Sequence, residues 1–87
     1  MRVTQGTLNA TVNKINEMTN SPTEYRADGV IQIGHYTLSG AYGGWQLQRV
    51  MNTGGGVDLP LGETGHVPKK ELYGLMQSFI RGLEVPA

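Results

Sequence analysis

Residues 23–51, TEYRADGVIQIGHYTLSGAYGGWQLQRVM, decide the fold of this chain. The dipeptide Asp28-Gly29 is a strong signal for a two-residue hairpin turn. After it, the β-branched, aromatic and aliphatic side chains of residues 30–38 favour a pleated, half-buried surface. Gly34 inside this run indicates a bulge or the close approach of another backbone. The stretch therefore predicts antiparallel strands at the centre of the chain.

A further strand is predicted over residues 45–51. Its alternation places Trp45, Leu47 and Arg49 on one face, and Gln46, Gln48 and Val50 on the other. Residues 52–66 are rich in glycine and are expected to form a long loop.

Helices are predicted on both sides of these strands. In residues 4–18, Leu8, Val12, Ile15 and Met18 recur at helical spacing. Asn20, Ser21 and Pro22 then stop the helix. From Pro68 to residue 83, a second apolar stripe is formed by Leu72, Leu75, Met76, Phe79, Ile80 and Leu83. The order helix, small antiparallel sheet, helix predicts an α+β fold in a single domain over residues 1–87.

The length and composition limit what this domain can be. The chain has 87 residues, seven Lys plus Arg, seven Asp plus Glu, and no cysteine. A domain of this size has a thin core, and no disulfide or thiolate metal site can reinforce it. We therefore expect a homo-oligomer.

Composition also restricts the partners. The formal charge is zero, so a nucleic-acid partner is not expected, because non-specific nucleic-acid binders usually carry a basic excess. No apolar run approaches the ~20 residues that span a bilayer, and no signal-peptide core follows Met1. The expectation is a soluble, cytoplasmic protein with no membrane partner.

Catalytic chemistry is not indicated. There is no cysteine nucleophile, and His35 and His66 lie far apart without a metal-ligand spacing such as HExxH. No convincing acid–base pair is present. We predict a protein that is not an enzyme and that uses no metal and no cofactor.

The glycines around residues 39–57 have two interpretations. AYGG is neither the dinucleotide fingerprint nor the phosphate-loop motif. Gly43 and Gly44 either form a tight turn or let backbone amides approach a ligand. Tyr42 and Trp45 either pack in the core or offer π faces to a base.

Other residues near this segment have the chemistry of a nucleotide site. Arg49 offers a two-pronged fork for phosphate. Asn52 can read ring edges or ribose hydroxyls, or form a turn. Gly55 and Gly56, in TGGGV, let backbone N–H groups form an anion-binding concavity.

Two lysines stand where the last helix begins. Lys69 and Lys70 fall in its first turn, where the helix dipole disfavours cations. They either form a solvated face or mark a docked anion. The candidate ligand-binding residues are thus Tyr42, Gly43, Gly44, Trp45, Arg49, Asn52, Gly55, Gly56, Lys69 and Lys70.

The segments LSGAYGGWQLQRVMNTGGGV and GHVPKKELYGLMQSFIRGLE, with INEMTNSPTEYRADG before them, resemble a group of small bacteriophage proteins. Within that group the chain is similar to the Thoeris anti-defence sponge proteins. The resemblance implies a homo-oligomer that binds cyclic ADP-ribose-type signals or cyclic oligonucleotides in the infected bacterial cytoplasm. Such proteins sequester the immune signal without cleaving it. The alternatives are a phage protein-interaction module that inhibits a host protein, and a structural phage protein whose glycines serve folding alone.

Overall fold

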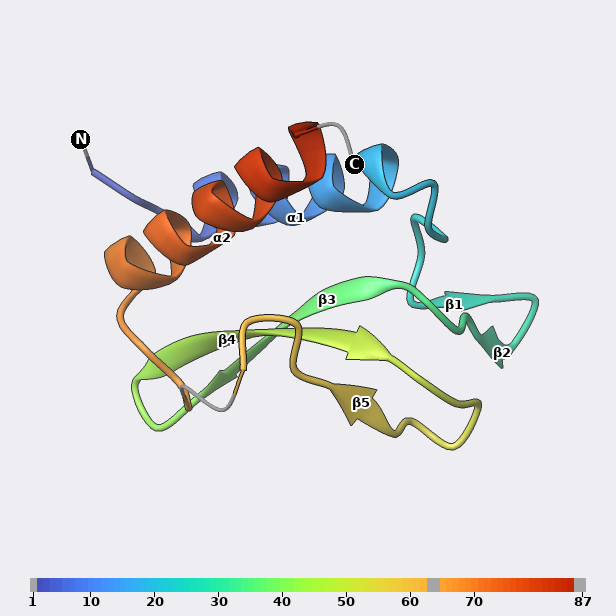
Figure 1. Cartoon of the computed structure of the whole chain (residues 1–87). Helices are drawn as coiled ribbons and strands as arrows, with labels where there is room; N and C mark the ends of the chain where they lie inside the picture. Colours follow the sequence, from blue (N-terminus) through green and yellow to red (C-terminus); the bar gives the residue numbers. More distant parts are fainter. Residues whose placement is uncertain (1, 63–64, 86–87) are drawn as a thin grey trace.

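The predicted order of elements is confirmed in the computed structural model, which describes residues 2–62 and 65–85. Two helices form one layer and the strands form the other (Figure 1). The elements are α1 (Gln5–Met18), β1 (Arg26–Ala27), β2 (Val30–Ile31), β3 (Tyr36–Ala41), β4 (Gly44–Val50), β5 (Val57–Asp58) and α2 (Lys69–Glu84).

Side-chain and backbone caps set the ends of α1. Thr4 and Thr7 form a reciprocal capping box, which satisfies amides that the first turn leaves free. At the other end Asn20 takes a left-handed φ of 55°, and Ser21 N–H donates to the Asn16 carbonyl at 2.9 Å. This is a Schellman ending with asparagine in the usual glycine position.

The strands pair in two separate antiparallel sheets. β1 and β2 pair through the predicted turn, where Asp28 and Gly29 have φ values of 52° and 78°. Residues 32–35 separate β2 from β3. Within them Gly34, which the sequence predicts to mark a bulge or a close backbone approach, takes a φ of 95°, and its N–H donates to the Val50 carbonyl at 2.8 Å. β3 then pairs with β4, and β4 with β5.

The turn between β3 and β4 is shifted by one residue from the predicted one. Ala41 pairs with Gly44, so Tyr42 and Gly43 occupy the turn, with φ values of 54° and 73°. Positive φ at both central positions is the type I′ geometry that suits the twist of a hairpin.

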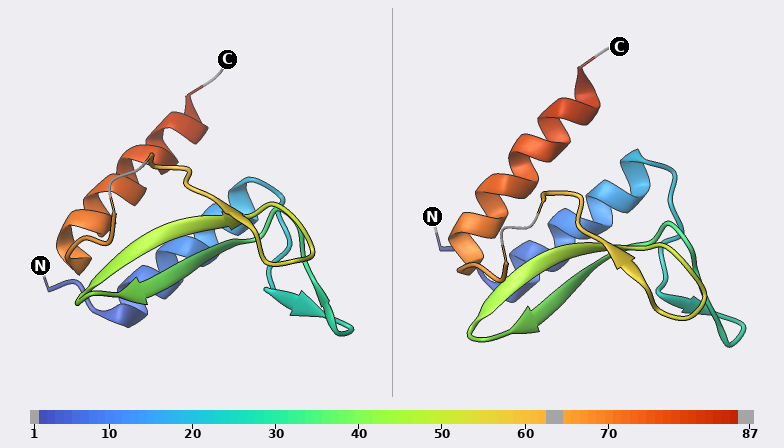
Figure 2. Two further views of the ribbon diagram at one scale, coloured as in Figure 1. Left: turned by 90° about the horizontal axis from the view of Figure 1, so that it is seen from below. Right: turned by 60° about the horizontal axis from the view of Figure 1, so that its bottom comes forward.

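Both helices lie on the same face of the three-stranded sheet (Figures 1 and 2). The predicted stripes supply most of the core, which consists of Leu8, Val12, Ile15, Tyr36, Leu47, Leu72, Met76 and Ile80. Met18 and Leu83, at the ends of the stripes, are instead 37% and 40% exposed. The strand face that meets the helices carries Tyr36, Leu38, Trp45 and Leu47 and ends at Arg49. The other face carries Thr37, Ser39, Gln46 and Gln48, together with the buried Val50.

Candidate functional site

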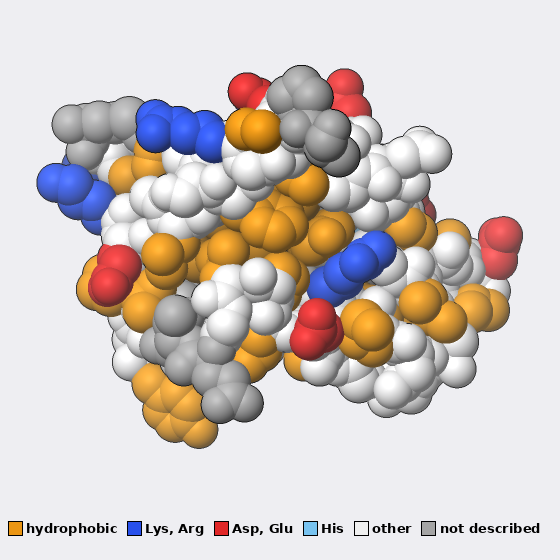
Figure 3. Space-filling view, in the orientation of Figure 1, with side chains coloured by type: hydrophobic (Ala, Val, Ile, Leu, Met, Phe, Trp, Pro, Cys, Tyr) orange, Lys and Arg blue, Asp and Glu red, His pale blue; other side chains and the backbone are white. Residues whose placement is uncertain are grey.

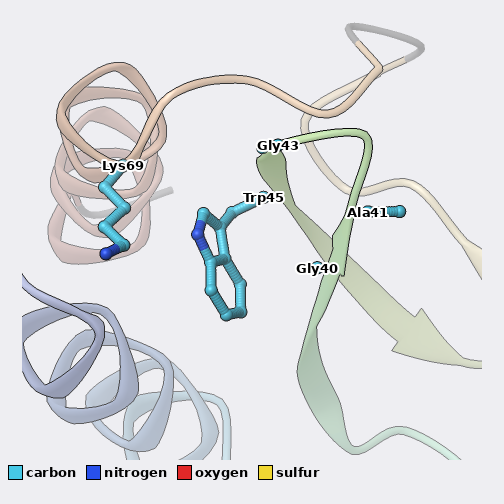
Figure 4. A pocket seen from close by; sticks show the side chains of 6 residues that line it. Gly40, Ala41, Gly43, Trp45 and Lys69 are labelled. Atoms are coloured by element: carbon cyan, nitrogen blue, oxygen red, sulfur yellow. The ribbon is translucent and has the colours of Figure 1, made fainter.

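A shallow, open depression lies between the β3–β4 hairpin and the start of α2. It encloses about 480 Å³ and is lined by Gly40, Ala41, Gly43, Gly44, Trp45 and Lys69. Figure 4 shows the Lys69 side chain descending from α2 beside the Trp45 indole. The depression thus combines an aromatic surface with an ammonium group.

Gly40 and Val67 fix the position of Trp45. Gly40 is its strand partner, and a Cβ at Gly40 would lie 3.1 Å from the indole Cζ3. The ring therefore lies against a strand position that has no side chain. On the other edge of β4, Trp45 N–H donates to the Val67 carbonyl at 2.8 Å, and Val67 N–H donates back at 2.9 Å. This bridge places Lys69, two residues further on, beside the indole.

Gly44 has a different role from the predicted one. It is buried, and a Cβ there would lie 2.8 Å from the carbonyl carbon of His66. The close approach that Gly44 permits is made by the backbone of His66 and Val67, not by space left for a ligand. At Gly43, by contrast, a Cβ would meet nothing within 4 Å, and this glycine serves the turn.

Tyr42 lies away from Trp45. Its ring meets the His66 ring edge-on, with centroids 5.8 Å apart. His66 Nε2 is 3.1 Å from Ser39 Oγ, and Ser39 stands on the face of β3 opposite to the one on which Trp45 meets Gly40. The two aromatic rings therefore do not form one stacking site within a single chain.

Arg49 lies far from the depression, at the other end of β4. Arg49 is four residue steps along the strand from Trp45, a distance of about 13 Å. Its Nε donates to the Gly34 carbonyl at 3.3 Å, and its guanidinium lies 5.1 Å from the centroid of the Tyr36 ring. Trp45 and Arg49 lie on the same face of β4, as predicted. They are too far apart along the strand for both to contact a ligand in the depression, and Arg49 does not line it.

Asn52 organises the glycine loop. Its Oδ1 accepts hydrogen bonds from Gly54 N–H and Gly56 N–H, both at 3.0 Å, and Gly55 N–H donates to the Asn52 carbonyl at 3.3 Å. The predicted anion-binding concavity is thus filled by the side chain of the same loop. A Cβ at Gly56 would collide with the Asn52 amide, so this glycine is required for the turn.

Four of the ten candidate residues therefore line the depression: Gly43, Gly44, Trp45 and Lys69. Lys70 is exposed and does not line it. Gly40 lines the depression although it is not one of the ten candidates. The strand register could have revealed it, because a turn at Tyr42-Gly43 places Gly40 opposite Trp45.

Comparisons with known proteins give no match to a family model, a curated protein sequence or a solved structure. Within residues 2–62 and 65–85, no three His, Cys, Asp or Glu side chains are grouped as a metal site. In the same described part of the chain, neither helix has the length and apolar character needed to cross a bilayer.

Proposed function

We propose that this protein binds and sequesters a nucleotide-type signal without cleaving it. In this proposal it is a bacteriophage sponge for cyclic ADP-ribose derivatives or cyclic oligonucleotides, and it acts in the cytoplasm of the infected bacterium. The proposal rests on one observation, which is that Trp45 and Lys69 line the same depression.

The chemistry of the depression supports an anion that carries a ring. An indole offers a face on which a base can stack, which contributes about 1–3 kcal/mol per base. The Lys69 ammonium provides the charge that a phosphate requires, and Gly40 and Gly43 are exposed beside the depression. Among the residues that the structure describes, no acidic side chain lines the depression, so none of these lining groups repels an anion.

The start of α2 adds to this argument. Pro68 provides no side-chain cap for the helix. The first-turn amides of a helix carry partial positive charge, and a lysine in that turn is disfavoured unless an anion is nearby. The same turn also carries the acid Glu71, which the dipole favours. A phosphate bound beside Lys69 would add to that compensation.

The depression is open to solvent. It would retain a ligand only if another surface covered it. Ligand pockets usually bury most of the surface of the ligand. Homo-oligomeric assembly, as expected for so short a chain, would provide that cover.

Titration calorimetry with cyclic ADP-ribose and with a cyclic dinucleotide tests the proposal. We expect Lys69→Ala to weaken binding about 10- to 150-fold, because a charge-assisted hydrogen bond contributes about 1.5–3 kcal/mol. Lys70→Ala is the matched control, since it removes the same charge from the same helical turn but outside the depression. Equal losses in the two variants, or no binding of either probe, would refute the assignment of the site.

The fate of the ligand is followed in the same samples. After denaturation, chromatography should return each probe intact. A linear product formed in excess of the protein would identify an enzyme instead.

A further inference from the structure

β3 is an edge strand, and the backbone groups on its outer side are only partly paired. The sheet order is β3, β4, β5, and Figure 2 shows β3 at the margin of the sheet. The N–H and carbonyl of Tyr36 bond to the Asn16 side chain, and those of Trp45 bond to Val67. Tyr36 and Trp45 therefore belong to the pairs of the β3–β4 ladder whose backbone groups point away from the partner strand.

Leu38 and Gly40 point their backbone groups in the same direction as Tyr36. Backbone direction alternates along a strand, so their N–H and C=O groups face outward. Within residues 2–62 and 65–85, no group outside the sheet is hydrogen-bonded to them. Gly40 is exposed and Leu38 is half-buried. The Asn16 amide thus occupies the first position of a neighbouring strand, and the next two positions are open.

The sequence of β3 does not protect this edge against pairing. Natural sheets protect their edges with short strands, charged side chains, proline or bulges. β5, at the opposite edge, has two residues and includes Asp58. β3 has six residues, pairs with β4 without a bulge, and contains neither charge nor proline. An edge of this kind can accept an extended peptide as an added strand.

The open stretch is short, because about 7 Å separates Leu38 from Gly40 along the strand. A stable dimer buries about 800 Å² on each partner, which so short an edge does not provide by itself. A linear peptide needs less surface, since main-chain hydrogen bonds provide the affinity and one or two side-chain contacts provide the specificity.

The depression beside Trp45 determines which side chain fits. Residues paired across a ladder point to the same face, so a peptide residue opposite Gly40 points toward the helices. Gly40 has no side chain to occupy that space, and it lines the depression together with Lys69. Among the described residues no acid lines the depression. An acidic side chain of the peptide is therefore the complement to the Lys69 ammonium.

We propose that β3 binds an extended, acidic segment of another protein as an added antiparallel strand. The main chain of that segment pairs with Leu38 and Gly40, and a carboxylate opposite Gly40 binds Lys69. This interaction goes beyond nucleotide binding. The two ligands exclude each other, because both place an anion beside Lys69.

The acetylated and amidated pentapeptide Thr-Glu-Thr-Val-Thr is the probe, titrated into the full chain and followed by NMR. Antiparallel pairing places its Glu opposite Gly40 and its Val opposite Leu38. We expect the amide signals of Leu38 and Gly40 to shift. N-methylation of the Glu and Val amides removes the donors that face β3 and should weaken binding about tenfold or more.

N-methylation of the last two threonines is the matched control, because their amides point to solvent. It should change the affinity by less than about threefold. Equal losses with the two methylated peptides, or no shift of the Leu38 and Gly40 amides at millimolar peptide, would overturn the proposal.

A double-mutant cycle tests the contact with Lys69. Replacing the peptide Glu by Gln should weaken binding to the wild type about two- to fivefold, as for a solvent-accessible ion pair, and should not change binding to Lys69→Ala. Lys70→Ala is the matched control and should respond as the wild type does. The same loss in all three proteins would place the carboxylate elsewhere.

Hydrogen exchange of the free chain tests the edge itself. The amides of Leu38 and Gly40 should exchange about tenfold or more faster than those of Thr37 and Ser39, which bond to β4. Slow exchange at Leu38 and Gly40 would show that the edge is already covered, by the chain or by a second copy, and would contradict the proposal. A chain that binds the peptide but neither nucleotide probe would refute the proposed function and leave the added strand standing.

Discussion

Asp28 and Tyr42 occupy the same position in the two type I′ turns. They differ in how well their side chains tolerate a left-handed backbone. Asp28 and Tyr42 both take positive φ, and each precedes a glycine that does the same. Aspartate tolerates this region because its short polar side chain forms local hydrogen bonds, whereas a tyrosine does not have that option. The backbone strain is therefore greater at Tyr42 than at Asp28, although the two residues have nearly the same φ.

We expect Tyr42→Asn to raise the melting temperature of the protein and Asp28→Tyr to lower it. A strain difference of about 1 kcal/mol corresponds to about 4–8 °C in a domain of this size. Circular dichroism melts at one low concentration provide the measurement. Variants that both melt within about 2 °C of the wild type would show that Tyr42 is not strained.

Gly44 is needed because there is no room for a side chain at this position. Its Cα lies beneath the backbone of His66 and Val67, so any side chain there meets main-chain atoms that the Trp45–Val67 bridge holds in place. A flexible side chain could move aside, but this paired backbone cannot.

Gly44→Ala should therefore destabilise the fold by about 1–3 kcal/mol, the usual cost of overpacking. The same change at Gly74, inside α2, is the control, because a Cβ there meets nothing within 4 Å. Gly74→Ala should stabilise the helix by about 0.5–1 kcal/mol. Urea unfolding measures both, and a neutral Gly44→Ala would contradict the close approach.

At the scale of elements, Asn16 joins α1 to the edge of the sheet. Its side chain accepts from Tyr36 N–H at 2.8 Å and donates to the Tyr36 carbonyl at 3.0 Å, as a neighbouring strand would. Asn16 is 1% exposed. From the sequence, this polar residue would be expected on the solvent side of the helix. This pair of hydrogen bonds orients the helix on the strand more specifically than apolar packing alone.

Replacement of Asn16 by alanine should cost about 2–6 kcal/mol, because it leaves two buried backbone groups unsatisfied at about 1–3 kcal/mol each. Asn13→Ala, on the exposed side of the same helix, should change the unfolding free energy by less than about 0.5 kcal/mol. Chemical denaturation compares them. If the two variants are equally stable, Asn16 does not link α1 to the sheet.

At the scale of the whole molecule, the two layers are thin. Hydrophobic side chains reach the surface between the helices and the sheet (Figure 3), as expected when so few residues must cover both layers. The depression at the hairpin end lies where α2 begins.

The fold could be predicted from sequence because its signals are local. The apolar periods of 68–83 and 4–18, and the turn dipeptide Asp28-Gly29, each act through neighbours in the chain. Such signals determined the helix, sheet, helix order and most of the core. The predicted alternation does not describe burial along β4, where Leu47 and Val50 are both buried.

The grouping of the candidate site residues was decided only by the tertiary structure. Trp45 and Lys69 meet because the Val67 backbone pairs with β4, a contact between segments that no local pattern specifies. Arg49, only four positions from Trp45, is carried away because an extended strand rises about 3.3 Å per residue. Asn52 and the glycines after it satisfy one another inside their loop. The sequence by itself thus determined which residues have the chemistry to bind a nucleotide, whereas long-range backbone pairing decided which of them share one surface.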